Sequence, residues 1–259
     1  MAAYDIVGNI VIVKFDKDVK SREKKKFALK FLKEHKNVRT VLEKIDKFSG
    51  RLRVQKTKFV YGEKTKEVLY KENDCVFRFN VDKCYFSPRL ASERREIAGM
   101  CKRGEKVLVM FGGVAVYAII IAKLSRAEKV VSVEISRQCN KYAVENVKRN
   151  KVNNAEIIQG DVRRVIWMGK KVNKDFDRVV MPRPNLKDSF LDVAFSMIKK
   201  GGFIHYYGFY KEDEADKLKE LIFEEAKKAK KKVRILKIKK AGEIGVRRYR
   251  FRVDLRILD

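Results

Sequence analysis

From Lys106 onward, short apolar runs alternate with amphipathic segments in a strand, helix, strand, helix order. Strands are expected at 106–111, 129–135, 156–158, 177–181 and 203–209, and helices at 115–124, 138–150, 186–198 and 211–230. Short apolar strands separated by helices indicate a parallel sheet that is covered on both faces. The last apolar stretches, 233–238 and 249–257, are expected to pair as a hairpin through a loop containing Gly242 and Gly245. This order predicts an α/β, Rossmann-like domain built on a seven-stranded sheet.

The first part of the chain has a different pattern. An apolar stretch at 4–15 is broken by the turn Gly8-Asn9 and is followed by a helix containing Phe27 and Phe31. Further strands are expected at 38–45, 51–61, 67–69 and 76–81. We therefore expect two domains, a small α+β domain over residues 1–84 and the large domain over residues 85–259. The exposed positions of the small domain are expected to be mostly Lys and Arg, which is typical of a domain that contacts RNA.

The charge of the chain points to its partner. There are 63 Lys and Arg against 34 Asp and Glu, a formal net charge of +29. Such an excess of one sign is typical of proteins that bind RNA or DNA. Nine of the fourteen residues at 227–240 are Lys or Arg, and the arginines of 248–256 alternate with apolar residues. Strand periodicity predicts that those arginines share one face, where they contact RNA or keep a sheet edge soluble.

Other classes of protein are excluded by composition. The 4 cysteines include no C-x-x-C pair and there are only 2 histidines, so no metal site is expected and the thiols are expected to be reduced. The longest apolar run, 114–122, is too short for a membrane span, and the N-terminus has no basic segment followed by an apolar one. A cytoplasmic protein without membrane association is expected.

Three expected strand ends carry groups suited to a nucleoside. Gly112-Gly113 follows the first strand of the large domain, Glu134 ends the second, and Asp161 follows the third. Small residues let a cofactor approach the backbone, and a carboxylate about 20 residues further on accepts both ribose hydroxyl protons. Each feature alone is also explained by a tight turn or a solvated carboxylate. Because parallel strands bring these ends together, we expect a nucleoside-type cofactor there.

The segment before this sheet reads Tyr85-Phe86-Ser87-Pro88-Arg89-Leu90 and continues to Glu93-Arg94. Here the chain resembles the archaeal and eukaryotic tRNA (guanine-37-N1)-methyltransferase family. The resemblance continues through 111–114, 160–163, 177–181 and the segment 201–207, which ends in His205-Tyr206-Tyr207. It implies a class I methyltransferase domain that uses S-adenosylmethionine, with tRNA as partner. We also expect the chain to be a monomer. The family's N-terminal domain, which grips the tRNA elbow, is expected to be missing, and residues 1–84 resemble the family's second domain.

The resemblance also implies roles for single residues. Glu93 matches the general base that takes the proton from guanine N1, and Arg53 matches the arginine that binds guanine O6. The positions that match the surroundings of S-adenosylmethionine are Arg89, Phe111, Gly113, Glu134 and Asp161. Guanine N1 is a poor nucleophile until it is deprotonated, so a base and a nearby cation suit the reaction. The residues alone favour a different interpretation of Glu93, a helix-surface carboxylate paired with a neighbouring arginine. For Arg53 they fit a phosphate-contacting surface charge equally well.

Three departures from the family pattern affect these expectations. Val109 replaces an aspartate at the end of the first strand, and Ala115 replaces a glycine in the donor loop. The family's Asn-Leu-Pro is Pro182-Arg183-Pro184 here, which removes the amide that helps to read the target base. Arg183 is the nearest polar substitute, so Arg183 and Pro184 are the expected substrate-binding residues.

The sequence predicts a methyltransferase that modifies N1 of the guanine 3′ of the anticodon, position 37. One alternative is the related wybutosine aminocarboxypropyltransferase, which uses the same donor but lacks the Pro-Arg-Leu found at 88–90. The other is a catalytically silent tRNA-binding homologue, suggested by Val109, Ala115 and Pro182.

Overall fold

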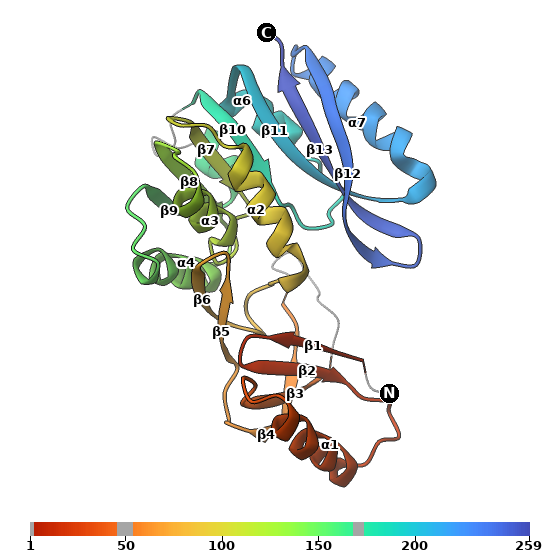
Figure 1. The fold of residues 1–259 in the computed structure, drawn as a ribbon. Coiled ribbons are helices and arrows are strands. Elements are labelled where there is room, and N and C mark those ends of the chain that lie inside the picture. Colours follow the sequence, from red (N-terminus) through yellow and green to blue (C-terminus); the bar gives the residue numbers. More distant parts are fainter. Residues whose placement is uncertain (1–2, 46–53, 168–173) are drawn as a thin grey trace. The chain divides into compact units, whose positions relative to one another are not determined.

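The computed structural model describes residues 3–45, 54–167 and 174–259 (Figure 1). The chain divides into two compact units, Met1–Pro88 and Arg89–Asp259. Arg53, the residue expected to bind guanine O6, lies outside the described residues.

The first unit is a four-stranded sheet with one helix and a separate hairpin. Its elements are β1 (Ala3–Val7), β2 (Ile10–Lys14), α1 (Ser21–Glu34), β3 (Thr40–Lys44), β4 (Thr57–Gly62), β5 (Glu67–Glu72) and β6 (Cys75–Asn80). The sheet order is β1-β2-β3-β4, and β5 pairs with β6. Helix α1 links the parallel strands β2 and β3 and buries Ala28 and Phe31 in one core with Val11 and Val41. The turn at Gly8 has φ +58°, and a Cβ there would lie 2.1 Å from the Leu69 carbonyl oxygen, so glycine is required.

The second unit is built on a seven-stranded sheet of order β12-β13-β11-β10-β7-β8-β9. Its strands are β7 (Lys106–Met110), β8 (Lys129–Glu134), β9 (Ala155–Gln159), β10 (Phe176–Met181), β11 (Ile198–Lys211), β12 (Val233–Gly245) and β13 (Arg248–Ile257). Its helices are α2 (Ala91–Met100), α3 (Val116–Leu124), α4 (Arg137–Arg149), α5 (Val162–Trp167), α6 (Leu191–Met197) and α7 (Ala215–Lys228), with short 3₁₀ turns η1 (Pro88–Leu90) and η2 (Glu212–Glu214). Strands β7 to β11 run parallel, whereas β13 is antiparallel to both β11 and β12. The predicted seven-stranded α/β sheet with a terminal hairpin is confirmed.

Several boundaries differ from the prediction, each for a local reason. The helix expected from residue 186 begins at Leu191, because Phe190 adopts a left-handed conformation (φ +57°) as its N-cap. Gly242 and Gly245 lie inside β12 at irregular pairs with β13 rather than in the hairpin loop. Helices α2 and α5 are not predicted by apolar periodicity, because α2 buries the charged residues Glu93 and Arg94 and α5 has only 6 residues.

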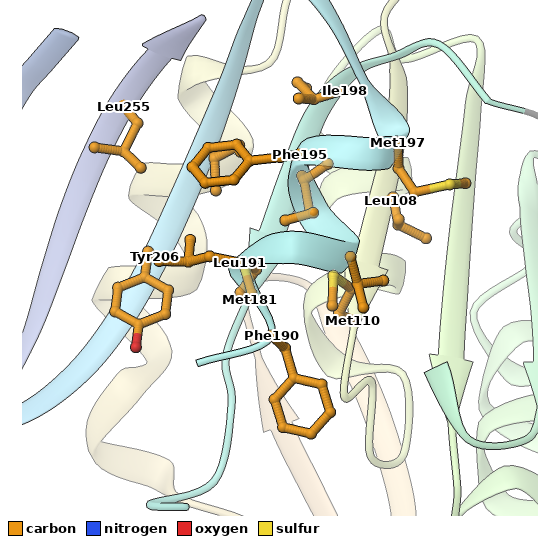
Figure 2. Close-up of a cluster of buried hydrophobic side chains, with 14 of the residues drawn as sticks. Leu108, Met110, Met181, Phe190, Leu191, Phe195, Met197, Ile198, Tyr206 and Leu255 are labelled. Atoms are coloured by element: carbon orange, nitrogen blue, oxygen red, sulfur yellow. The ribbon is translucent and has the colours of Figure 1, made fainter. Parts of the chain in front are cut away.

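One face of the large sheet is apolar. Alternate residues of the central strands, among them Met110, Met181 and Tyr206, pack against α5, α6 and α7 in a single buried cluster. Figure 2 shows Phe195 and Leu191 of α6 lying against these strand side chains. Burial of this continuous apolar surface supplies the main driving force for folding of the second unit.

The opposite face of the sheet is polar at its centre. The residues that point to this side include Arg178 of β10, His205 of β11, and Arg252 and Asp254 of β13, and all are buried. Helix α2 crosses this face (Figure 1), and the Arg178 guanidinium donates to the carbonyl of Met100 at the end of α2. A sheet face with buried charges requires that each charge be paired.

The connection from β7 to α3 contains an unusual concentration of left-handed residues. Phe111, Gly113 and Ala115 all have positive φ, and Ala115 (φ +65°) is the N-cap of α3. A left-handed alanine costs roughly 1–2 kcal/mol because its Cβ crowds the following carbonyl. The position where the family pattern has glycine therefore retains a backbone conformation that favours glycine.

We expect Ala115→Gly to raise the free energy of unfolding by about 1 kcal/mol, since glycine relieves the strain of the left-handed turn. The midpoint temperature of thermal unfolding, Tm, would then rise by roughly 2–4 °C. Ala118→Gly, a matched change inside the same helix, should instead lower stability by about 1 kcal/mol. Equal destabilisation by both variants would contradict this account of the turn.

Candidate active site

The ends of β7, β8 and β9 are joined by hydrogen bonds to the side chain and the backbone carbonyl of Glu134. One carboxylate oxygen, Oε2, accepts from the amide of Gly113 at 2.8 Å, and Oε1 accepts from the amide of Ser136 at 2.7 Å. The carbonyl of Glu134 accepts from the amide of Gly160 at 2.8 Å. Glu134 thus ties together the three loops that the sequence predicts as the cofactor site. Burial raises the pKa of Glu134, and the amides of Ser136 and Gly113 oppose that shift by stabilising the carboxylate.

The two glycines after β7 have different surroundings. A Cβ on Gly112 would lie 2.0 Å from the Ser132 hydroxyl oxygen, whereas one on Gly113 would meet nothing within 4 Å. The backbone at Gly113 is therefore open to an approaching ligand. Asp161 Oδ1 accepts from the Arg163 amide at 2.8 Å at the start of α5, which holds its carboxylate at the end of β9.

The remaining cofactor candidates occupy different settings. The Phe111 ring meets Phe190 edge to face at a centroid distance of 5.0 Å, and the Arg163 guanidinium lies over Phe190 at 4.9 Å. Arg89 is exposed in the 3₁₀ turn η1. Val109, which replaces the family aspartate, is fully buried in β7 and presents no polar group.

Glu93 lies in the first turn of α2 and is only 5% exposed. Its Oε1 accepts from the Tyr207 hydroxyl at 2.7 Å and from Arg252 Nη1 at 2.6 Å. Its Oε2 lies 3.4 Å from Lys239 Nζ. The alternative interpretation, a helix-surface carboxylate paired with a neighbouring arginine, is wrong because the helix turns Glu93 inward onto the sheet, where its arginine partner is the distant Arg252.

Glu93 is one end of a chain of charged groups across the polar face of the sheet. Arg252 Nη2 donates to Asp254 at 3.0 Å, and Asp254 Oδ1 lies 2.6 Å from His205 Nδ1. Nε2 of His205 lies 2.6 Å from Arg178 Nη1, and Arg178 makes two bonds of 2.8 and 2.9 Å to the carboxylate of Glu105. We call this set, from Glu93 to Glu105, the buried charge chain.

The protonation state of His205 follows from its neighbours. Arginine only donates, so Nε2 of His205 accepts from Arg178, and Nδ1 carries the proton that is donated to Asp254. Burial lowers the pKa of His205, which keeps the ring neutral, although Asp254 acts in the opposite direction. Burial would raise the pKa of Asp254, but the His205 hydrogen bond and the Arg252 charge hold it below its ordinary value.

Arg183 requires a correction. It was expected to contact the substrate, but it is only 6% exposed, and its Nη2 donates to the carbonyls of Leu186 and Asp188 at 2.5 Å each. The guanidinium pins the loop between β10 and α6 instead of facing solvent. Pro184, within the same loop, remains partly exposed.

The arginines of the last strand also divide into two groups. Arg248 and Arg256 are exposed, as expected for a basic surface. Arg252 is 0% exposed, and the expectation that it belongs to a solvent-facing basic stripe is wrong. Helix α2 covers this part of the face and supplies Glu93 and Glu96 as partners.

Residue types alone did not identify Tyr207 or Arg252 as neighbours of Glu93. One signal was present, because Asp254 is two residues from Arg252 and so shares its face of the strand. An acidic residue within an alternating run of arginines indicates an internal ion pair rather than a uniform RNA-binding face.

Within the described ranges, no group of three or more His, Cys, Asp or Glu side chains is placed to hold a metal ion. No helix in those ranges is long and apolar enough to cross a membrane.

Models of two known protein domains match the two parts of the chain. The model of the TRM5/TYW2 methyltransferase domain matches residues 68–236, and that of the TYW2 N-terminal domain matches residues 1–65. The chain belongs to the TRM5/TYW2 family. The predicted family and the class I methyltransferase fold are thereby confirmed.

Three members illustrate the similarity. The tRNA (guanine(37)-N(1))-methyltransferase Trm5b of Pyrococcus abyssi is 36% identical over 98% of this chain and 74% of its own length. Its crystal structure gives a TM-score of 0.87 over 99% of this chain and 75% of that one. The tRNA (guanine(37)-N(1))/4-demethylwyosine(37)-methyltransferase Taw22 of Nanoarchaeum equitans is 33% identical over 99% of this chain and 100% of its own. The structure of Methanocaldococcus jannaschii TYW2 in complex with AdoMet is 25% identical, with a TM-score of 0.75 over 99% of both chains.

We expect Arg178→Met to destabilise this TRM5/TYW2 family member by roughly 3–5 kcal/mol, because it leaves the buried Glu105 without its cation. The control is Lys106→Met, which removes an ion pair to Glu128 whose side chains are 51% and 59% exposed. Lys106→Met should lower the free energy of unfolding by at most about 1 kcal/mol. Chemical denaturation measures both, and a loss of less than 1 kcal/mol for Arg178→Met would show that the buried charge chain does not depend on this arginine.

Proposed function

We propose that this protein transfers the methyl group of S-adenosylmethionine to N1 of guanine 37 in tRNA. The observation that carries the proposal is the position of Glu93, a buried carboxylate held by hydrogen bonds from Tyr207 and Arg252 in the same unit as the donor loops. Family membership and the names of the relatives support the reaction and its substrate.

The residues of this chain account for the acid–base part of the reaction. Glu93 takes the N1 proton of guanine as the N1 electron pair forms the bond to the methyl carbon. The donor supplies an electrophilic methyl group on a positively charged sulfur, and that sulfur keeps the electrons of the broken bond. Glu93 ends protonated and the positive charge on sulfur is lost, so the charges balance. Arg53 stays a prediction for the group that stabilises negative charge on O6.

We propose that Glu134 holds the donor ribose, with Arg89, Phe111, Gly113 and Asp161 around the rest of the donor. The carboxylate of Glu134 already lies at the junction of the three loops, bound to the amides of Gly113 and Ser136. Val109 contributes no polar contact here, so Glu134 carries more of the recognition than it would beside an aspartate.

The tRNA would be bound through the basic surface of the chain. Exposed positive residues include Lys25 and Lys30 on α1, and Arg248 and Arg256 on β13. We propose that residues 1–84 act as an RNA-contacting domain and residues 85–259 as the catalytic domain. Pro184 is proposed to contact the target base directly, whereas Arg183 acts through the loop that it holds. None of the four cysteines, all of which are described, forms a disulfide, which suits a cytoplasmic location.

A second candidate is aminocarboxypropyl transfer from the same donor. It is favoured by the match of residues 1–65 to the TYW2 N-terminal domain and by the TYW2 structure described above. Against it stands the sequence Pro88-Arg89-Leu90, which resembles the methyltransferases.

We expect Glu134→Ala to weaken S-adenosylmethionine binding by roughly 10- to 100-fold, since the ribose loses a charged acceptor. Affinity for tRNA should stay nearly unchanged, because the basic surface is intact. Glu134→Gln is the control for loop structure, since it keeps one oxygen acceptor for the amides and should show an intermediate loss. Calorimetric titration measures both ligands, and equal weakening of donor and tRNA would show that the donor site lies elsewhere.

We expect Glu93→Gln to lower the single-turnover rate of methyl transfer by roughly 10²- to 10⁴-fold, the usual contribution of a general base. Binding of donor and tRNA should be retained. The variant rate should rise more steeply with pH than that of the wild type, because hydroxide must replace the carboxylate. Glu128→Gln, an exposed carboxylate in the same unit, serves as the control. Full activity of Glu93→Gln would remove Glu93 as the base.

A further inference from the structure

The two oxygens of the Glu93 carboxylate have different surroundings. Oε1 accepts two short hydrogen bonds, from the Tyr207 hydroxyl at 2.7 Å and from Arg252 Nη1 at 2.6 Å. Among the described residues, Oε2 has one hydrogen-bonding neighbour, Lys239 Nζ, at the longer distance of 3.4 Å. Donors that point at one oxygen stabilise negative charge there and block its lone pairs. The carboxylate is therefore held by one oxygen and left available at the other.

We propose that Tyr207 and Arg252 are positioning residues that hold Oε1 of Glu93, so that Oε2 is the oxygen that accepts the N1 proton of guanine. This inference rests on the proposed function, in which Glu93 is the base. Neither residue is required to touch the substrate, and both act through Glu93.

Tyr207 is suited to be a permanent donor. Burial raises the pKa of Tyr207 well above its ordinary value, so the phenol keeps its proton. The Tyr117 hydroxyl lies 3.3 Å from the Tyr207 hydroxyl and donates to it. With that lone pair occupied, the Tyr207 proton is directed to Glu93. Tyr117 lies in the first turn of α3, so this pair of phenols links the base to the helix that follows the donor loop.

Arg252 is held in place independently of Glu93. Its Nη2 donates to Glu96 at 2.8 Å and to Asp254 at 3.0 Å, and Asp254 is itself bound to His205. Because the guanidinium is planar and always charged, these contacts set the direction in which Nη1 points. The orientation of Glu93 is thus determined by the sheet below it and not only by its own helix.

Lys239 does not block Oε2. Its ammonium is shared with Glu96, which is the closer partner, and the lysine side chain is 35% exposed on the edge strand β12. A flexible and partly solvated cation moves aside at little cost. The other charged or titratable groups near Glu93 are Arg94 and Glu96 on α2, Tyr117 on α3, and Asp254 on β13, which lies behind Arg252.

The test is Tyr207→Phe, which removes one hydroxyl and keeps the ring. We expect the single-turnover rate of methyl transfer to a tRNA transcript with guanine at position 37 to fall roughly 10- to 100-fold, the effect of losing a hydrogen bond to a charged group. Affinities for donor and tRNA should be unchanged. In a plot of rate against pH, the low-pH side of the curve, its acid limb, should move to higher pH. The reason is that Glu93 loses the hydroxyl of Tyr207, which stabilises the charged carboxylate.

The matched control is Tyr206→Phe, on the same strand but facing the apolar cluster, where the retained ring still lies under Arg183. It should leave the rate and the pH profile unchanged. Arg252→Lys is an independent test. Lysine keeps the positive charge but has one nitrogen in place of the two Nη groups that contact Glu93 and Glu96. It should shift the acid limb of the pH–rate profile in the same direction as Tyr207→Phe. A purely structural role would lower thermal stability without moving that limb.

The outcomes separate the two proposals. If Glu93→Gln is slow, and Glu93→Gln with Tyr207→Phe is no slower than Glu93→Gln alone, both residues act on one step and the positioning role is supported. If Glu93→Gln is slow while Tyr207→Phe and Arg252→Lys match the wild type in rate and pH profile, the positioning role is overturned and the base remains. If Glu93→Gln is fully active, the proposed function of Glu93 fails, and the positioning role fails with it.

Discussion

Arg252 carries a full charge in a place with no access to solvent, and the polar face of the large sheet is arranged around it. Glu93 and Glu96 reach it from α2, and Asp254 reaches it from its own strand. A buried cation of this kind adds little net stability, because desolvation offsets much of the attraction, but removing a partner is costly. The geometry of the partners is therefore tightly constrained. The consequence for function is that Glu93, which would otherwise be a mobile side chain on a helix surface, is held in one orientation.

The same arrangement links the two halves of the proposed reaction. The loops that we propose bind the donor meet at Glu134, and α3 begins directly after the first of them. Tyr117 in the first turn of α3 contacts Tyr207, and Tyr207 contacts Glu93. A displacement of the loop before α3 would therefore be transmitted to Glu93, the proposed base, through the hydroxyl groups of Tyr117 and Tyr207. Preorganised groups of this kind contribute to catalysis because they need not reorient as the reaction proceeds.

Local sequence pattern predicted most of the sheet and the loops at its edge. The features that it did not predict share a cause, because they depend on buried charged residues. The alternation of strands and helices predicted the sheet, and the spacing of Gly113, Glu134 and Asp161 predicted the loops that meet at its edge. Apolar periodicity did not predict α2, because its inward face carries Glu93 and Arg94 in place of apolar side chains. Arg183 and Arg252 were expected to face RNA, since a buried arginine is uncommon and its partners come from distant segments. Contacts such as Glu93 to Arg252, 159 residues apart, depend on tertiary structure that local pattern does not reveal.

The most direct test of the central claim is the identity of the product. The protein is incubated with S-adenosylmethionine and an unmodified tRNA transcript that carries guanine at position 37, and the RNA is digested to nucleosides for mass spectrometry. We expect 1-methylguanosine from this transcript and none when position 37 is changed to adenine. An aminocarboxypropyl nucleoside, a methyl group on another atom, or no modified nucleoside at all would contradict this expectation.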